Sequence, residues 1–409
     1  MGSARDVAEQ AARRSYGRLV AWLVAQFNDI ALAEDAVGEA LATALDRWPQ
    51  NGVPDNPEGW LATVARRTIL NHRARSGRFE AAVPFLKLIA DERTDGVTSD
   101  WPDDRLKLMF ACTHPAIDPA MHTPLILQTI LGFNAVEIGS AFCVAPASMG
   151  QRLVRTKRKV TQAGISFSIP DETDLPARLS AVLDAIYAAF GVSWTDPTSD
   201  EARDVAEEAI WLTHLVDRLL PGRAEVLGLT ALMLFSHARR RARRSPEGAF
   251  VPLSEQDTSL WDTEMMSEAD AHLRLAASIE SIGRYQLEAA IQAAHAGRAR
   301  FGHTDWEIVA GLYDRLWDLH PTIGVFLGRA MAIAELKGPE TGLALLRELP
   351  TDKVTAHQPY WAALAELLCR AGNATGSRDA YMKANALSDD PAVRQYLASR
   401  SEALIKDNS

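Results

Sequence analysis

The chain has 409 residues, of which 47% are hydrophobic and 23% are charged, and its formal net charge is −10. This length exceeds one ordinary domain, and the composition is typical of a globular protein with sizeable cores. No apolar run is long enough to cross a bilayer, the N-terminus lacks the apolar core of a signal peptide, and three widely spaced cysteines make no disulfide framework. We therefore expect a cytoplasmic protein with no membrane partner.

The charge is unevenly distributed along the chain. Residues 1–170 contain 19 Lys and Arg against 18 Asp and Glu, whereas residues 171–409 contain 24 against 35. Within the first part, residues 61–79 and residues 138–170 carry cations but no carboxylates. This pattern predicts an anionic partner for the first part and an acidic domain behind it that competes for the same cations.

Helical periodicity dominates almost every apolar stretch, and strand signals are nearly absent, so we predict an all-α fold. We assign residues 1–78 to a first helical domain, 79–102 to a linker, 103–163 to a second helical domain and 164–409 to a larger third one. In the third domain, "VFLGRAMAIAELKG" and "YWAALAELLCRAGN" each precede a second short helix, which is the logic of tetratricopeptide-like (TPR-like) helical hairpins.

The first functional candidate is an acidic helix face in "LAEDAVGEALATALDRW". Asp35 and Glu39 lie four residues apart, on one side of the predicted helix. A carboxylate pair is compatible with acid–base catalysis, but no His, Ser or metal-ligating group accompanies it. We interpret this face as a surface for a protein partner.

The stretch "GWLATVARRTILNHRARSGRF" follows, after a predicted helix start with Asn56 as cap and Pro57 in the first position. Its polar side fits single-stranded DNA, where cations follow the backbone and bases splay into polar pockets. Trp60 alone is better explained by a buried core position than by base stacking. The candidate residues for the DNA strand are Trp60, Arg66, Arg67, Asn71, Arg73 and Arg75.

A helix-turn-helix pattern covers residues 134–159. "NAVEIGSAF" predicts a short helix with Val136, Ile138 and Phe142 facing inward, "CVAPA" a tight turn, and the following basic segment a second helix. Such a second helix reads base edges with its polar front and meets phosphates with its cations. The competing interpretation is a solvated cationic face. The base-edge candidates are Ser148, Gln151 and Arg152, and the phosphate candidates are Arg155, Lys157, Arg158 and Lys159.

Two other sequence patterns give weaker indications of function. Cys112, His114 and His122, with Cys143 further on, fit no familiar zinc spacing, so we expect no metal site there and no cofactor. The basic run "SHARRRARR", residues 236–244, is either a solvated helix end or a segment docked on an acidic surface.

Several motifs in this order resemble those of the extracytoplasmic-function (ECF) sigma factors. They are "AEDAVGEALATALDRWP", "NPEGWLATVARRTILNHRAR" and "VEIGSAFCVAPASMGQRLVRTKRK". Further stretches, among them "DDRLKLMFACTHPAI", "LPARLSAVLDAIYAAF" and "LSEQDTSLWD", are similar to the subgroup with a C-terminal tetratricopeptide-like extension. Together they extend the resemblance over nearly the whole chain.

The resemblance implies sigma region 2, a linker, sigma region 4 and a regulatory extension, acting by binding and not as an enzyme. Its implied partners are core RNA polymerase, through the β′ clamp helices and the β flap, and promoter DNA. Asp35, Glu39 and Leu41 match the clamp surface, Trp60 to Arg73 the −10 element helix, and Ser148 to Arg155 the −35 reading helix. Gly150 departs from the basic residue common in that helix. We further hypothesise that the acidic extension controls the sigma domains in cis, either by contacting their cationic DNA-binding helices or by aiding polymerase docking.

Two other functions are open at this point. A stand-alone helix-turn-helix regulator with a helical sensor domain would bind duplex DNA without polymerase, and would leave the stretch from Trp60 to Arg78 without a role. A scaffold of helical repeats would leave both basic stretches merely solvated.

Overall fold

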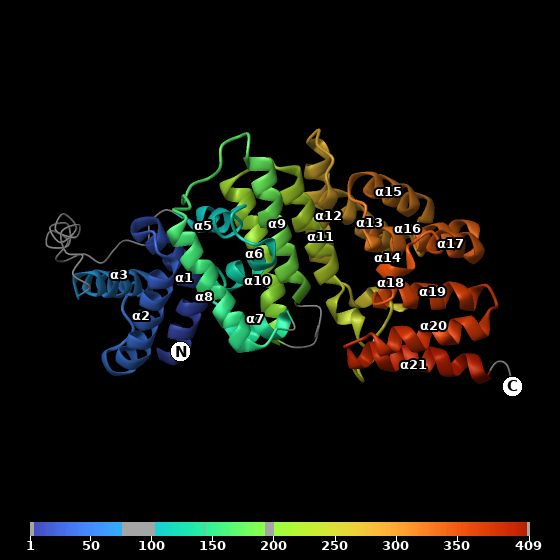
Figure 1. The fold of residues 1–409 in the computed structure, drawn as a ribbon, viewed down its shortest axis with the longest axis horizontal. Helices are drawn as coiled ribbons and strands as arrows, with labels where there is room; N and C mark the ends of the chain where they lie inside the picture. Colours follow the sequence, from blue (N-terminus) through green and yellow to red (C-terminus); the bar gives the residue numbers. More distant parts are fainter. Residues whose placement is uncertain (1–3, 76–102, 143, 193–199, 407–409) are drawn as a thin grey trace. The chain divides into compact units, whose positions relative to one another are not determined.

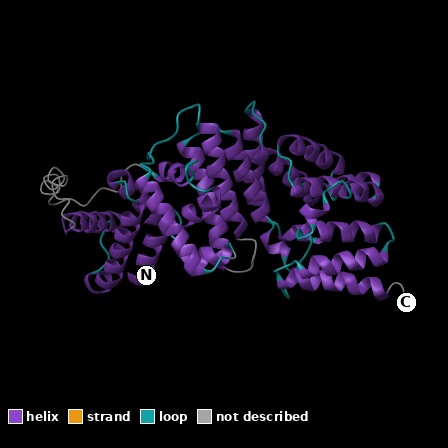
Figure 2. Ribbon diagram, in the orientation of Figure 1, coloured by secondary structure: helices purple, strands orange, loops and turns teal. Residues whose placement is uncertain are grey.

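The computed structural model describes residues 4–75, 103–142, 144–192 and 200–406, and it divides into two compact units, Met1–Ala189 and Phe190–Ser409 (Figure 1). Helices make up the regular structure, and no strand occurs among the described residues (Figure 2). The all-α prediction is confirmed. The predicted linker, residues 79–102, lies outside the described residues.

The first unit begins with three long helices, α1 (Ala4–Phe27), α2 (Ile30–Asn51) and α3 (Pro57–Arg75). The side chain of Asp29 caps α2 by accepting from Leu32 N at 3.0 Å. As predicted, Asn56 caps α3, since its Oδ1 accepts from Gly59 N at 2.9 Å, and Pro57 is the first helical residue. The buried faces of the three helices form one core, whose larger side chains include Leu19, Leu23, Ile30, Val37, Leu61 and Ile69.

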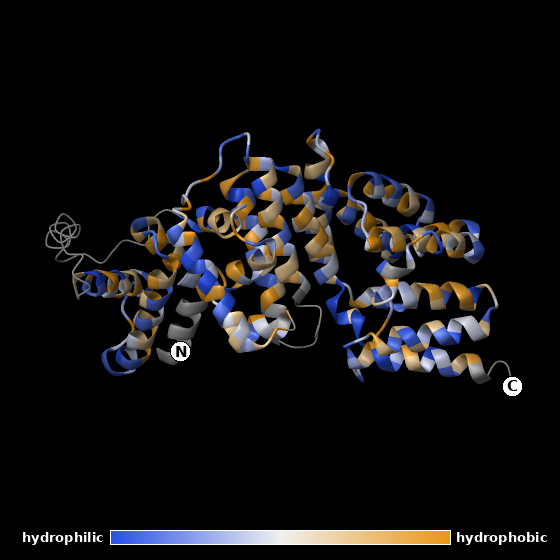
Figure 3. Cartoon of the chain, in the orientation of Figure 1, coloured by the Kyte–Doolittle hydropathy of each residue, from blue (hydrophilic) through white to orange (hydrophobic). Residues whose placement is uncertain are grey.

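Shorter helices complete the first unit. They are α5 (Arg105–Cys112), η2 (Pro119–Met121), α6 (His122–Thr129), α7 (Ala135–Ala141), α8 (Pro146–Gln162) and α9 (Leu175–Val192). Helices α5 and α6 are buried over almost their whole length, whereas α8 is apolar along one face (Figure 3).

Arg178 of α9 contacts α5 in the first unit. The guanidinium of Arg178 donates to the backbone oxygen of Phe110 and lies 6.0 Å from the centre of the same residue's ring. The compact unit accordingly ends at Ala189, whereas the sequence placed the start of the third domain at residue 164. The difference arises because periodicity predicts a helix but not the neighbour against which it packs.

The second unit starts around a helix that is buried over almost its whole length. α11 (Ala224–Ala238) is flanked by α10 (Asp200–Leu219) and α12 (Thr263–Ser278), with the short turns η3 (Arg240–Arg243), η4 (Leu253–Glu255) and η5 (Thr258–Leu260) between α11 and α12. Thirteen consecutive residues of α11, from Val226 to Ala238, are buried. A helix that is apolar on all sides is the expected centre of such a bundle.

The basic run after α11 is bound within its own unit. Arg239 is buried and donates to Oε1 of Gln292 at 2.5 Å, and Arg244 forms an ion pair with Asp390 at 2.5 Å. For these two residues the interpretation as a solvated helix end is wrong, because burial and specific partners replace solvent.

A half-buried histidine lies near Arg239 and Arg298. Burial lowers the pKa of His295 to about 4, and the positive charges of Arg239 and Arg298 act in the same direction. The imidazole is therefore neutral at physiological pH.

The remaining helices pack as successive hairpins. They are α13 (Arg284–Ala296), α14 (Arg298–Phe301), α15 (Trp306–Leu319), α16 (Ile323–Lys337), α17 (Pro339–Leu346), α18 (Thr351–Val354), α19 (Gln358–Arg370), α20 (Ala374–Ala386) and α21 (Pro391–Lys406). Their apolar side chains form three separate clusters, shared by α13, α15 and α16, then by α16, α17 and α19, and then by α19, α20 and α21. A core divided into clusters between successive helices is typical of stacked repeats.

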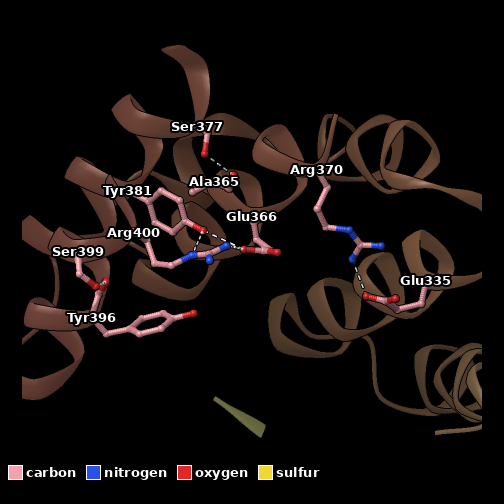
Figure 4. Close-up of polar contacts among 9 residues, drawn as sticks. All are labelled: Glu335, Ala365, Glu366, Arg370, Ser377, Tyr381, Tyr396, Ser399 and Arg400. Carbon is pink, nitrogen blue, oxygen red and sulfur yellow. Dashed lines mark hydrogen bonds and ion pairs between the residues drawn. The ribbon is translucent and has the colours of Figure 1, made fainter. Parts of the chain in front are cut away.

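Polar contacts join the last hairpins at their exposed sides (Figure 4). Glu366 on α19 accepts from Tyr381 OH on α20 at 2.9 Å and from Nη2 of Arg400 on α21 at 3.0 Å. Arg370 on α19 pairs with Glu335 on α16 at 2.5 Å. These contacts fix the register of neighbouring helices around cores built largely of alanine and leucine.

Candidate nucleic-acid interface

Helices α7 and α8 form a tight helical pair. Asn134 and Glu137 make a reciprocal capping box at the start of α7, with Asn134 N donating to Glu137 Oε2 at 2.7 Å. Gly139 allows the following turn to close, because a Cβ at that position would lie 2.6 Å from the backbone oxygen of Val144. Val136, predicted to face inward, is 62% exposed and the prediction is wrong there, whereas Ile138 is fully buried.

Helix α8 separates an apolar face from a polar one as the sequence predicts. Met149, Leu153 and Val160 are buried. Most of the candidate DNA-contacting residues are exposed on the rest of the helix. These are Ser148, Gln151, Arg152, Arg155, Arg158 and Lys159.

Lys157 is the exception on α8. Its Nζ lies 2.5 Å from Oε2 of Glu34 on α2, and the two side chains are only 10% and 9% exposed. Burial raises the pKa of the Glu34 carboxyl, and the Lys157 ammonium opposes that rise. The ammonium is thus committed to a carboxylate inside the first unit, and in this arrangement it is not available to a phosphate.

The partner of Lys157 adjoins the predicted polymerase surface. On α2, Asp35 and Glu39 are exposed and Leu41 is half-buried, while the opposite face of the helix is in the core. Glu34 precedes Asp35 directly, so α8 contacts α2 at the edge of the acidic strip. Nothing in the local sequence pattern around Glu34 identifies its partner, which lies 123 residues further along the chain.

On α3, the candidate −10 residues differ in exposure. Arg67 and Asn71 are exposed, and Arg66 is half-buried. Trp60 is half-buried with its ring edge-on to Trp48, at 5.5 Å between centroids. This contact gives Trp60 a packing role and leaves only part of its surface open.

At the end of α3, Arg73 caps another helix. Its Nη2 donates to the backbone oxygen of Phe27, the last residue of α1, at 2.6 Å, and its guanidinium stacks 4.9 Å from the Phe27 ring. The side chain of Arg75 lies outside the described residues. Within this unit, Arg73 holds α1 and α3 together.

Of the residues weighed as metal ligands, Cys112 and His114 make other contacts, and Cys143 lies outside the described residues. Cys112 is buried, lies 3.5 Å from the Thr129 hydroxyl, and has a pKa raised to about 12 by burial. His114 Nδ1 accepts from Ala116 N at 3.1 Å. Over the part of the chain that is described, metal-compatible spacing is found instead at His214, Glu268 and His272. In the sequence, "EADAH" at residues 268–272 shows Glu268 and His272 four residues apart, but no local pattern indicates that His214 on α10 lies beside them.

Among the described helices, none combines the length and apolar character that crossing a membrane requires.

Two segments of the chain match known protein families. Residues 12–79 match the family described as Sigma-70 region 2, and residues 178–277 match a family of unknown function (DUF6596). An uncharacterised protein of Rhizobium meliloti (strain 1021) is 36% identical over 396 residues, covering 94% of this chain and 93% of its own. No solved structure matches the chain.

Proposed function

Because the chain belongs to the same family as the full-length Rhizobium meliloti relative and begins with a sigma-70 region 2 domain, we propose that it is an ECF-type RNA polymerase sigma factor with a TPR-like regulatory extension. The match over residues 12–79 carries this proposal, since region 2 implies binding to core polymerase and promoter DNA. The protein acts by binding, and the chemistry of RNA synthesis belongs to the polymerase.

The exposed strip on α2 supports polymerase docking. Asp35 and Glu39 are solvent-facing on a helix whose other face is fixed in the core, so their carboxylates are presented rigidly. Leu41 adds a half-buried apolar contact beside them. We propose that this strip binds the β′ clamp helices.

On α3, exposed Arg67 and Asn71 support capture of the −10 strand after the duplex opens. Unstacked bases offer hydrogen-bonding edges that a duplex hides, and each captured base offsets its lost stacking. Arg66 and the open part of Trp60 extend the same surface.

The α7–α8 pair supports −35 recognition. A short capped helix, a closed turn and a second helix with six exposed polar or cationic candidates have the layout of a helix-turn-helix. Ser148, Gln151 and Arg152 lie in the first half of α8, where base edges are read, and the exposed Arg155, Arg158 and Lys159 follow toward the phosphates. The same domain would pack on the β flap.

The Glu34–Lys157 pair suggests a closed, inactive arrangement. Promoter elements centred at −10 and −35 are separated by about 25 base pairs, or roughly 85 Å of duplex. A compact unit of about 190 residues has a radius of gyration of about 16 Å, so α3 and α8 within it cannot reach both elements at once. We propose that the α2–α8 contact opens when polymerase and promoter are engaged.

The acidic extension would control this transition in cis. Residues 171–409 carry nearly all of the net negative charge, which suits competition with DNA for the basic helices. The test is in vitro transcription with the full chain and with a chain ending at Ala189, which retains most of α9 and the Arg178 contact. Higher activity of the shorter chain supports inhibition, lower activity supports a required role, and equal activity contradicts control in cis.

Co-purification of the untagged full chain with core polymerase tests the general proposal. We expect a stoichiometric complex that is weakened by the double substitution Asp35→Asn and Glu39→Gln. Substituting the exposed Asp46 on the same helix to Asn is the matched control. Duplex binding without any polymerase complex would instead support the stand-alone regulator.

A further inference from the structure

Three ligand-type side chains meet between α10 and α12 in the second unit. Nε2 of His214 on α10 lies 3.6 Å from Oε1 of Glu268 on α12, and Nε2 of His272, one helical turn further along α12, lies 3.9 Å from the same oxygen. One ligand atom from each residue lies within 4.8 Å of the other two. The rings of the two histidines are tilted, with centroids 5.3 Å apart.

These distances fall outside ordinary hydrogen bonding. Both His–Glu separations exceed 3.5 Å, and Nδ1 of His272 is buried without a hydrogen-bond partner among the described residues. Hydrogen bonding therefore does not explain why two imidazoles converge here. Tetrahedral zinc with bonds of about 2.0–2.1 Å places its ligand atoms roughly 3.4 Å apart, so small side-chain rotations would complete such a shell.

The charge of the site favours a cation. Glu268 contributes a carboxylate, and Asp217 acts on His272 from α10.

We propose that His214, Glu268 and His272 form a zinc site that links α10 to α12. Two imidazoles and one carboxylate are the donor set that suits Zn²⁺, and three protein ligands leave one coordination position for water or an external ligand. The site lies within residues 178–277, the segment that matches the family of unknown function. The proposal is independent of the sigma-factor role, because the metal can be measured without polymerase or DNA.

The experiment uses the untagged full chain, stripped with a chelator and titrated with Zn²⁺ by calorimetry and with Co²⁺ by visible absorption. His214→Gln and Glu268→Gln are the informative variants, because these side chains are 37% and 49% exposed and their loss leaves the core intact. His303→Gln removes an exposed histidine of the same unit and is the matched control.

We expect one Zn²⁺ per chain and the intense Co²⁺ bands of four-coordination. Each informative variant should lower Zn²⁺ affinity at least tenfold, while His303→Gln leaves it unchanged. Zn²⁺ should also raise the thermal transition of the wild-type chain but not that of the variants. Failure of the wild-type chain to bind one equivalent, or equal affinity in His214→Gln, would overturn the proposal.

Discussion

Breaking the buried ion pair between Glu34 and Lys157 should open the first unit at α8. The two side chains are 9% and 10% exposed and their charged atoms are 2.5 Å apart, so removing one partner leaves the other charge buried without compensation. A change of this kind costs about 3–5 kcal/mol, whereas replacing both charges with neutral groups is nearly neutral. A loss of about 3 kcal/mol corresponds to roughly a hundredfold shift in an opening equilibrium.

Native-state hydrogen exchange of the α8 amides in the full chain measures this shift directly. Glu34→Gln and Lys157→Met should each accelerate exchange along α8 by about a hundredfold or more, and the double variant should restore much of the protection. Asp35→Asn is the matched control, because it removes an exposed carboxylate next to Glu34 and should change exchange by less than about 0.5 kcal/mol.

Transcription then links opening to function. Glu34→Gln leaves every candidate DNA contact on α8 in place, so at limiting chain concentration it should raise promoter-dependent transcription. Unchanged α8 exchange in both single variants would refute the buried-pair reasoning. Faster exchange with reduced transcription would show that the contact supports activity instead of restraining it.

Other predictions concern single positions. Gly139→Ala forces a Cβ against the backbone across the turn and should destabilise the first unit by about 1–3 kcal/mol. Gly150→Ala has its nearest neighbour at 3.7 Å and should stabilise the first unit by up to about 1 kcal/mol. Melting temperatures equal to that of the unsubstituted chain would contradict both predictions. Burial and two neighbouring guanidinium groups lower the pKa of His295 to about 4 in the folded chain. As the pH falls, the unfolded chain therefore binds this proton before the folded chain does, and about 2–3 kcal/mol of stability should be lost between pH 6.5 and 4.5. His295→Gln should flatten that pH dependence in urea titrations, and an unaltered slope would count against the assignment. Arg178→Ala removes the contact to Phe110 and should expose the segment before α9 to limited proteolysis, a change that would be absent if α9 were held by other contacts alone.

Local features were predictable from the sequence. The cap at Asn56, the start of α3 at Pro57 and the buried face of α8 follow from short-range rules of helix geometry, and the structure has them where expected. Val136 was misplaced because it lies in the first turn of a short helix, where one side is open to solvent.

Long-range features were not predictable in the same way. Periodicity marks Lys157 only as one more cation on a basic helix, and its carboxylate partner lies 123 residues earlier. The cluster of His214, Glu268 and His272 likewise joins two helices that are separated in sequence by the whole of α11. Such pairings depend on the packing of helices, which a single sequence does not encode in any local pattern.

The most direct test of the central claim is reconstituted transcription of the host's genomic DNA by core RNA polymerase, with and without this chain, followed by mapping of transcript 5′ ends. We predict new start sites that depend on the chain, share sequence elements upstream, and weaken when Arg67 and Asn71 or Gln151 and Arg152 are substituted. Start sites identical to those of core polymerase alone, combined with duplex binding by the isolated chain, would contradict the sigma-factor function.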